Sequence, residues 1–310
     1  MNKKVIKSYK AFDKNMQCRG FQYEVGKEYE MDGEIKCCDR GFHACKSPME
    51  VWDHYDMLSS RFAEVEQSGK IDEEENSTKV CSSHIKIKAE LKLADIIKVG
   101  VEWLKDITSP SKVNSDGALN DNGDRKKQIG SIGNSAKIGS SGDYAQIGSS
   151  GDYAKIGSSG YSAKIGSIGN YAKIGSSGKY AKIGSSGDYA QIGSSGDYAK
   201  IGSSGYSAKI GSSGYSAKIV SSGNYAQIGS SGDYAKIGST GEDSVIMCAG
   251  NSSIAKAKVG SWITLAEWKW SYEKNHNVPV CVKTEYVDGD NIKADTLYQL
   301  KNGKFVEVQK

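Results

Sequence analysis

The chain has 310 residues, of which 37 are glycine and only 3 are proline, and its 41 lysines and arginines nearly balance 37 aspartates and glutamates. Because the positive and negative charges nearly cancel, the net charge does not indicate binding to nucleic acid or to an anionic membrane. A glycine-rich chain with few prolines and no three-residue period is not collagen, so it is either a flexible linker or a repeat with tight turns.

The N-terminal residues 1–7 are basic, but no apolar run of signal-peptide length follows them. No stretch approaches the roughly 18 apolar residues of a membrane span. The seven cysteines are an odd number scattered along a large chain, unlike the disulfide framework of a small secreted protein. We therefore expect a cytoplasmic protein with reduced thiols and no membrane contact.

Residues 1–107 have mixed composition and predict a small α+β domain. Ser47, followed by a proline and by Glu50, predicts a capping box that opens a helix through about residue 58. Apolar residues at helical spacing predict a second helix over 93–106. Alternation and β-branched content predict strands at residues 5–12, 21–25 and 83–88.

From Ile129 to Ile246 an isoleucine recurs every nine residues, at fourteen consecutive positions, with alanine two residues before most of them. An unbroken period of nine is too short for a helical repeat and indicates stacked β units. The unit predicts a strand Tyr-Ala-Lys-Ile and a turn Gly-Ser-Ser-Gly, whose glycines accept tight-turn dihedrals and whose serines form hydrogen-bonded ladders. Alanine and isoleucine then face inward, and tyrosine and lysine face outward.

Two nine-residue units, about 18 residues, close one coil with two short sheets, which gives about eight coils. After the repeats, strands are expected at residues 262–268, 278–286, 296–300 and 305–308, the last two joined by a hairpin turn. These strands would cap the open edge of the solenoid. The fold class is thus mainly β, with an α+β domain (1–107), a linker and solenoid start (108–127), β-solenoid repeats (128–260) and a β-rich cap (261–310).

Two resemblances add context. The Ser-x-Ala-x-x-Gly style of the repeats, clearest in 244–260, resembles the left-handed β-roll repeats in the heads of trimeric autotransporter adhesins, although those repeats are longer than nine residues. Cys-Arg-Gly-Phe-Gln-Tyr-Glu at 18–24, Gly-Phe-His-Ala-Cys at 41–45 and Val-Glu-Gln-Ser-Gly at 65–69 resemble an uncharacterised family of phage and prophage proteins. Its members often place comparable short repeats after this domain. The resemblances imply a phage or mobile-element context and no particular chemistry.

The outward lysine and tyrosine columns are the candidate binding surface. Because alternate units fall on opposite sides of the coil, each side carries its own lysine ladder. Two lysines about one coil apart repel by about 1 kcal/mol in water before screening, so each ladder needs compensation from turn aspartates or from an anionic partner. Aromatic rings beside cations are also typical of surfaces that stack bases or form protein hot spots. A ladder that is only solvated is the alternative. The candidate residues are Lys155, Lys164, Lys173, Lys182, Lys200, Lys209, Lys218, Lys236, Tyr153, Tyr171, Tyr189 and Tyr198.

Metal and cofactor chemistry has weak support. Calcium-binding nonapeptides need Gly-Gly-x-Gly-x-Asp in successive turns, whereas these turns read Gly-Ser-Ser-Gly-Asp. A group of thiols and imidazoles has the chemistry of a zinc site but not a standard spacing, so buried cysteines that bind nothing are the expectation. We expect no cofactor. The zinc candidates are Cys37, Cys38, His43, Cys45, Cys81 and His84.

Three functions are consistent with these features. We favour a non-catalytic interaction protein of phage or mobile-element origin, whose solenoid docks onto a host protein or ribonucleoprotein and inhibits, for instance, a defence nuclease such as a CRISPR effector. Nucleic acid or a second copy of the chain is the alternative partner. The second function is a structural or adhesive module. The third is an enzyme in the N-terminal domain, because Glu64-Val65-Glu66 with Arg19 resembles part of an ADP-ribosyltransferase site, although a partner serine motif is missing.

Overall fold

The computed structural model describes residues 5–74, 77–108, 118–120 and 123–308. Most of the predicted linker, residues 109–117 and 121–122, lies outside these ranges. The chain divides into two compact units, residues 1–103 and 104–310. Within the described ranges, every helix is too short or too polar to cross a membrane.

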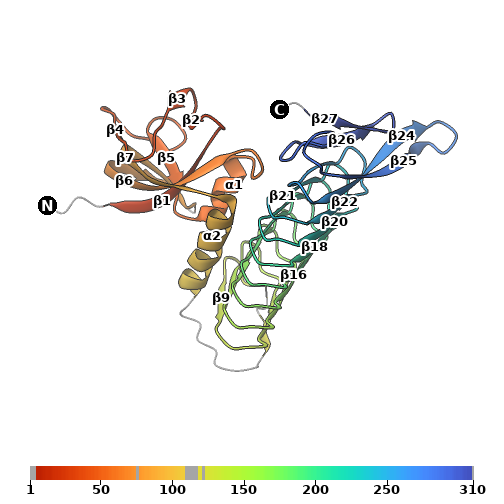
Figure 1. Cartoon of the computed structure of the whole chain (residues 1–310). Helices are drawn as coiled ribbons and strands as arrows, with labels where there is room; N and C mark the ends of the chain where they lie inside the picture. Colours follow the sequence, from red (N-terminus) through yellow and green to blue (C-terminus); the bar gives the residue numbers. More distant parts are fainter. Residues whose placement is uncertain (1–4, 75–76, 109–117, 121–122, 309–310) are drawn as a thin grey trace. The chain divides into compact units, whose positions relative to one another are not determined.

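The first unit is a small α+β domain whose strands pair antiparallel in a closed cycle (Figure 1). In this cycle β1 lies between β5 and β6, and β7 also pairs with both β5 and β6, while β4 extends the sheet at β7. A short hairpin, β2 and β3, stands apart. The elements are β1 (Ile6–Phe12), β2 (Gln17–Cys18), β3 (Phe21–Gln22), β4 (Glu28–Glu30), β5 (Phe42–Cys45), η1 (Pro48–Glu50), α1 (Val51–His54), β6 (Arg61–Glu73), β7 (Lys79–Leu91) and α2 (Leu93–Thr108).

The predicted strands at 5–12 and 83–88 and the helix that begins at residue 93 are confirmed, because their apolar faces build a buried core. Two predictions for this unit were too long. The strand expected at 21–25 is only two residues, and the helix expected from Ser47 to residue 58 ends at residue 54. Its capping box does not form, since Ser47 makes no side-chain cap hydrogen bond and the Glu50 carboxylate instead accepts from the Thr78 backbone N–H, at 3.3 Å.

The second unit is a β-solenoid with an 18-residue coil, as predicted. Each strand pairs in parallel with the strand 18 residues later, so that Lys137 lies opposite Lys155 and Ile138 opposite Ile156. Alternate strands build two sheets that stack along the solenoid (Figure 1). The first solenoid sheet contains β8 (Ala118–Asn120), β10 (Lys137–Ser140), β12 (Lys155–Ser158), β14 (Lys173–Ser176), β16 (Gln191–Ser194), β18 (Lys209–Ser212), β20 (Gln227–Ser230) and β22 (Val245–Cys248). The second contains β9 (Gln128–Ser131), β11 (Gln146–Ser149), β13 (Lys164–Ser167), β15 (Lys182–Ser185), β17 (Lys200–Ser203), β19 (Lys218–Ser221), β21 (Lys236–Ser239) and β23 (Ile254–Lys256).

Antiparallel strands end both stacks, in agreement with the predicted cap. In the first sheet, β24 (Trp262–Ser271) continues the parallel stack next to β22 and then pairs antiparallel with β25 (His276–Tyr286). In the second sheet, the hairpin of β26 (Tyr298–Lys301) and β27 (Lys304–Glu307) follows β23. The hairpin turn has positive φ at Asn302 and Gly303, as the sequence predicts.

The strands of the repeat are Lys-Ile-Gly-Ser, two residues later than the predicted Tyr-Ala-Lys-Ile. The inward direction of alanine and isoleucine is confirmed, since Ala154 and Ile156 are buried. The serine that ends each strand also points inward, and lysine and glycine point outward, as in Lys155 and Gly157 of β12. Tyrosine and lysine therefore do not share one strand face, which corrects the sequence prediction.

Each tyrosine instead lies in the turn before a strand, with left-handed backbone. Tyr153 has φ 57°, and tyrosine, serine or aspartate takes this conformation in every repeat from 135 to 252. The repeat glycines do not have positive φ, so their predicted role is corrected too. The second glycine of each repeat provides close contact: a Cβ at Gly160 would lie 1.9 Å from the carbonyl oxygen of Gly142 in the preceding coil.

The buried serines do not form the predicted hydrogen-bonded ladder. From Ser149 to Ser230, most strand-ending hydroxyls are buried without a hydrogen-bond partner among the described residues. The coils are connected by the backbone instead, since Ser159 N donates to Ser140 O at 3.0 Å. Small side chains at this position fit a thin core between the two sheets.

Candidate functional site

The predicted lysine ladder is divided between the two solenoid sheets. Because successive strands alternate between sheets, only every second lysine lies on a common face. The second-sheet lysines all take part in polar or electrostatic contacts, and Lys182 is only 7% exposed. The first-sheet candidates are Lys155, Lys173 and Lys209, which Lys137 joins, and the second-sheet candidates are Lys164, Lys182, Lys200, Lys218 and Lys236.

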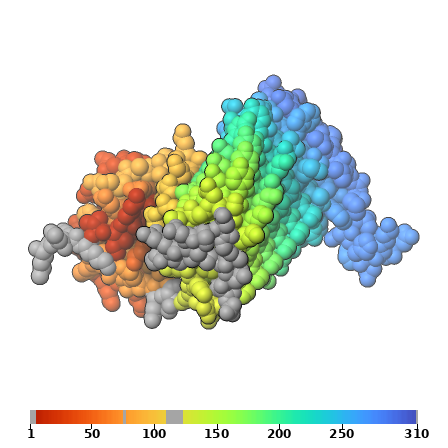
Figure 2. Space-filling model, turned by 90° about the horizontal axis from the view of Figure 1, so that it is seen from below, coloured from red at the N-terminus to blue at the C-terminus, as the bar shows by residue number. Residues whose placement is uncertain are grey.

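A groove of about 1090 Å³ runs along the outer face of the first solenoid sheet. One side is the column of lysine and glutamine from Lys137 to Gln227, and the floor is a column of glycines from Gly139 to Gly229. In space-filling view, the stacked side chains of the solenoid form continuous ridges with furrows between them (Figure 2). The repeat therefore converts a nine-residue sequence into one long linear surface.

The glycine floor is not required by local packing. A Cβ at Gly157, Gly193 or Gly229 would meet no atom within 4 Å, and φ is not positive at these residues. Glycine inside a strand costs roughly 0.5–1 kcal/mol relative to alanine. On the second sheet the same column has close neighbours, since a Cβ at Gly148 would lie 2.4 Å from Thr108 Oγ1. On the first sheet the glycines keep the groove open.

The groove is positively charged and has no counter-charge of its own. Its lining contains no aspartate or glutamate. The side chains of Lys137, Lys155, Lys173 and Lys209 make no ion pair or hydrogen bond within the described part of the chain. Lys137, Lys155 and Lys173 follow one another at one coil, about 4.8 Å, along the sheet, so their charges repel one another.

Within the described residues, the turn aspartates form no ion pair with the four groove lysines, and Asp197 lies 4.0 Å from Lys179 instead. Their carboxylates accept backbone N–H groups of the next coil, as Asp152 Oδ1 does from Asn170 at 2.7 Å and Asp188 Oδ1 from Tyr206 at 2.7 Å. These hydrogen bonds satisfy backbone N–H groups of the turns that have no backbone acceptor in the neighbouring coil. All five predicted aspartates act in this way, namely Asp143, Asp152, Asp188, Asp197 and Asp233.

The tyrosines form ladders at the turns rather than in the groove. The rings of Tyr153, Tyr171 and Tyr189 stack with centroids 5.1 and 4.9 Å apart and with nearly parallel planes. On the opposite turn, Tyr180 and Tyr198 stack at 5.0 Å. These contacts stabilise the turns, while one face of the ladder stays exposed to solvent.

Sequence reasoning missed the apolar end of the groove. Val245 and Met247 line this end, and Val245 is in register with Trp262 of β24. The Trp262 ring packs on Tyr286 with a centroid distance of 5.0 Å, and Met247, Trp262 and Tyr286 are each 43–54% exposed. We call Val245, Met247, Trp262 and Tyr286 the aromatic platform. The break in the repeat at Val245 and the alternation in β24 were the available signals, but from the sequence we assigned Val245 and Met247 to the last repeats and Trp262 and Tyr286 to the cap.

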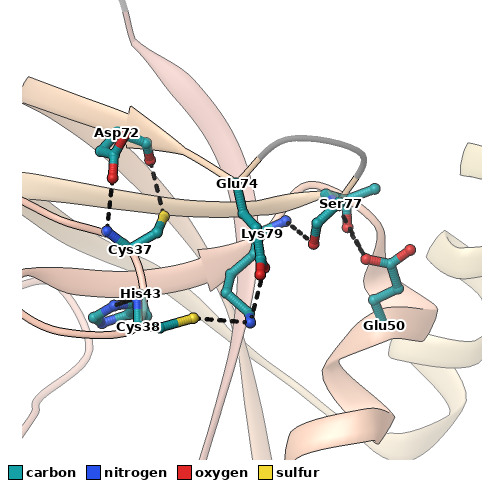
Figure 3. Close-up of polar contacts among 9 residues, drawn as sticks. Cys37, Cys38, His43, Glu50, Asp72, Glu74, Ser77 and Lys79 are labelled. Carbon is teal, nitrogen blue, oxygen red and sulfur yellow. Dashed lines mark hydrogen bonds and ion pairs between the residues drawn. The ribbon is translucent and has the colours of Figure 1, made fainter.

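The zinc candidates make other contacts (Figure 3). Cys38 N donates to His43 Nε2 at 2.9 Å, so this imidazole nitrogen already uses its lone pair, and Lys79 Nζ donates to Cys38 Sγ at 3.3 Å. Cys37 Sγ donates to the Asp72 carbonyl at 3.2 Å. Burial raises the pKa of both Cys45 and Cys81 to about 12. Within the described residues, no three histidine, cysteine or acidic side chains come together as a metal site.

The glutamates of the enzyme hypothesis are paired with lysines. Glu64 lies 2.9 Å from Lys7 and Glu66 lies 3.0 Å from Lys88, while Val65 between them is buried in the core. Alternation on β6 therefore places both glutamates on the face away from the core. Arg19 lines a separate cavity whose lining includes neither glutamate. The structure does not bring these three side chains together.

Residues 6–99 match the model of a family described as a domain of unknown function, DUF7666. The chain therefore carries this domain followed by a β-solenoid. No curated protein and no solved structure shows significant similarity to the chain.

Proposed function

We propose that this protein is a non-catalytic interaction protein that binds an extended acidic segment of a partner protein in the groove of the first solenoid sheet. The observation that carries the proposal is the row of four lysines without counter-charge beside an open glycine floor. An acidic segment would neutralise the lysines, and its backbone could approach the floor because no side chain covers it.

The dimensions of the groove suit an extended chain. From Lys137 to Gln227 the column has six positions separated by five coil spacings, which is about 24 Å at about 4.8 Å for each spacing. A fully extended peptide of about seven residues has this length. The aromatic platform at one end adds methionine and aromatic side chains, which are enriched in protein interfaces and form their hot spots. The platform favours a protein over a uniformly charged polymer.

The resemblance of residues 18–69 to phage and prophage proteins supports a bacterial host protein as the partner. In that setting the groove would dock onto a host protein or ribonucleoprotein, of which a defence nuclease is one example, in the host cytoplasm. Within the described residues, we find no arrangement of side chains that favours an adhesive module or an ADP-ribosyltransferase over this function.

Fluorescence anisotropy with a labelled peptide of eight glutamates, extended by a C-terminal tryptophan, tests the proposal. A variant with Lys137, Lys155, Lys173 and Lys209 replaced by glutamine should bind at least tenfold more weakly, because glutamine already stands at positions 191 and 227 of the same column. A control variant should keep its affinity within about twofold. It replaces four exposed lysines outside the groove by glutamine: Lys27, Lys92, Lys274 and Lys304.

Equal losses in the two variants would show that only net charge matters and would reject the groove. Tighter binding of a labelled oligothymidylate than of the peptide, lost in the groove variant, would make nucleic acid the partner instead. The aromatic platform provides a further test. Removing the C-terminal tryptophan from the peptide should weaken binding only if the peptide lies in the groove and its end reaches the platform.

A further inference from the structure

The first unit contains a cavity of about 640 Å³ that is distinct from the solenoid groove. Its lining includes Lys10 of β1, His43 of β5 and the segment around Arg19 and Phe21. This volume lies within the roughly 300–1,000 Å³ typical of small-molecule sites. The cavity combines buried polar groups with an aromatic wall, which is the composition of a small-molecule site.

Lys10 is a buried cation without a carboxylate partner. It is 5% exposed, and its Nζ donates to the His43 carbonyl oxygen at 2.8 Å and to Cys18 Sγ at 3.4 Å. Burial, the largest cause, lowers the pKa of Lys10, and the charge of Arg19 acts in the same direction. A charged group taken out of water is costly unless an opposite charge accompanies it. Within the described residues, the protein supplies none.

Arg19 is a second cation at the same cavity. Its guanidinium has no ion pair or hydrogen bond within the described residues, and its backbone has left-handed φ of 52°. Burial lowers the pKa of His43, and the charges of Lys10 and Arg19 lower it further, which shows that both cations act on one region. Asp39 and Asp53 also line the cavity, and within the described residues no ion pair joins Asp39 to Lys10 or Arg19.

Phe21 provides an aromatic surface at the cavity. The ring is 45% exposed and packs edge-on against Tyr23, with centroids 4.8 Å apart, and against Tyr29 at 5.3 Å. Edge-on packing fixes the ring and leaves one face available for a planar group. A large exposed phenyl beside two cations without partners is the arrangement expected for a flat, anionic molecule.

We propose that this cavity binds a small anion with a planar ring, of which a nucleoside phosphate is the simplest example. Lys10 and Arg19 hold the anionic group, and Phe21 stacks on the ring. The bound anion supplies the charge that Lys10 lacks, so the ammonium form of Lys10 becomes favourable inside the domain. Arg19 lies at the surface and can reach the same group without being buried.

Calorimetric titration of the full chain with ADP, pyrophosphate and adenosine tests this site. ADP should bind at least tenfold more tightly than adenosine, which lacks the charge, and more tightly than pyrophosphate, which lacks the ring. Lys10→Met and Arg19→Gln should each weaken ADP binding about tenfold or more. Phe21→Ala should weaken ADP but leave pyrophosphate unchanged.

Lys7→Met is the matched control, since Lys7 lies on the same strand and its partner Glu64 faces away from the core. This variant should bind ADP like the unmodified protein. If Lys10→Met fails to fold, as judged by circular dichroism, Arg19→Gln decides the question because it is an exposed side chain. The proposal is overturned if ADP does not bind, if adenosine binds as tightly as ADP, or if Lys7→Met weakens binding as much as Arg19→Gln.

Discussion

Gly160 of one coil packs so closely on Gly142 of the preceding coil that a Cβ on Gly160 would lie 1.9 Å from the Gly142 carbonyl oxygen. Three residues earlier, a Cβ on Gly157 would meet no atom within 4 Å. The two glycines of one repeat therefore have different roles. Gly160 allows successive coils to pack closely, and Gly157 leaves the floor of the groove without a side chain.

Replacing each of these glycines by alanine should therefore have opposite effects on stability. Gly160→Ala forces a methyl group against a backbone carbonyl and should lower the free energy of unfolding by about 1–3 kcal/mol. Gly157→Ala should leave it unchanged or raise it by roughly 0.5–1 kcal/mol, because alanine loses less backbone entropy on folding. Chemical denaturation of both variants measures the difference, and equal destabilisation would contradict the packing described.

The tyrosine turns allow strain and stacking to be separated. Tyr171 has φ 56° and stacks on both Tyr153 and Tyr189. Tyr171→Asn should lose about 1–3 kcal/mol from the two ring contacts, since asparagine tolerates left-handed backbone. Tyr171→Val should lower the free energy of unfolding by about 1–2 kcal/mol more, because a β-branched residue is strained in the left-handed conformation. Thermal unfolding compares them, and a valine variant as stable as the asparagine variant would argue against the left-handed turn.

The period of the repeat predicted the coil correctly, because isoleucine at every ninth residue can be buried only if successive units stack. It did not determine the strand. Both Tyr-Ala-Lys-Ile and Lys-Ile-Gly-Ser place isoleucine inward, so alternation alone could not choose between them. The choice depends on the turn, where the Gly160 contact and the left-handed Tyr153 are fixed by the neighbouring coil. Contacts between coils are invisible in one nine-residue unit.

The groove should close as side chains are added to its floor. In the series Gly193→Ala, Val and Leu, affinity for the acidic peptide should fall stepwise, reaching at least tenfold for leucine. Stability should be retained, because a Cβ at Gly193 would meet no atom within 4 Å and Met247 occupies the equivalent position of β22 in the same sheet. Anisotropy titrations with unfolding midpoints as the control measure both effects. Undiminished affinity in the leucine variant would exclude the groove as the binding site.

The aromatic platform gives a test with a matched partner. Trp262 is 47% exposed and in register with Val245 at the end of the groove, whereas Trp270 is 51% exposed near the far end of the same strand, where it is in register with Asn277. Trp262→Ala should weaken binding of the tryptophan-tagged acidic peptide about tenfold, and Trp270→Ala less than twofold. Similar losses in both variants would indicate non-specific contact with exposed indoles.

The candidate sites were harder to foresee than the fold for a related reason. The lysines of the ladder and their division between two faces were predicted correctly, because alternate units fall on opposite sides of a coil. The hydrogen bonds from the next coil to the turn aspartates were not predicted, because they depend on contacts between coils. Lys10 gave no signal at all, because a lysine in an alternating strand is usually exposed. Only the closed pairing of β1 with β5 and β6 shows that it is buried.

Lys10 should also make the stability of the protein depend on pH. Its folded-state pKa is lowered, so the ammonium form destabilises the folded state below that pKa, and the penalty disappears as the pH rises toward 10.5, the value of an unfolded lysine. The neighbouring groups that could titrate include Cys18, whose Sγ accepts a hydrogen bond from Lys10 Nζ at 3.4 Å and opposes the effect of burial on the Lys10 pKa. Burial raises the pKa of Cys45 and of Tyr23, so these two stay neutral through pH 9. Lys10→Met should thus unfold at a higher temperature than the unmodified protein at pH 7, and this advantage should shrink by pH 9 to 10.

A difference in Tm that stays constant from pH 6 to 10 would contradict a buried, uncompensated ammonium. Lys7→Met, whose partner Glu64 and neighbour Tyr9 raise the pKa of Lys7, should show no such gain at pH 7.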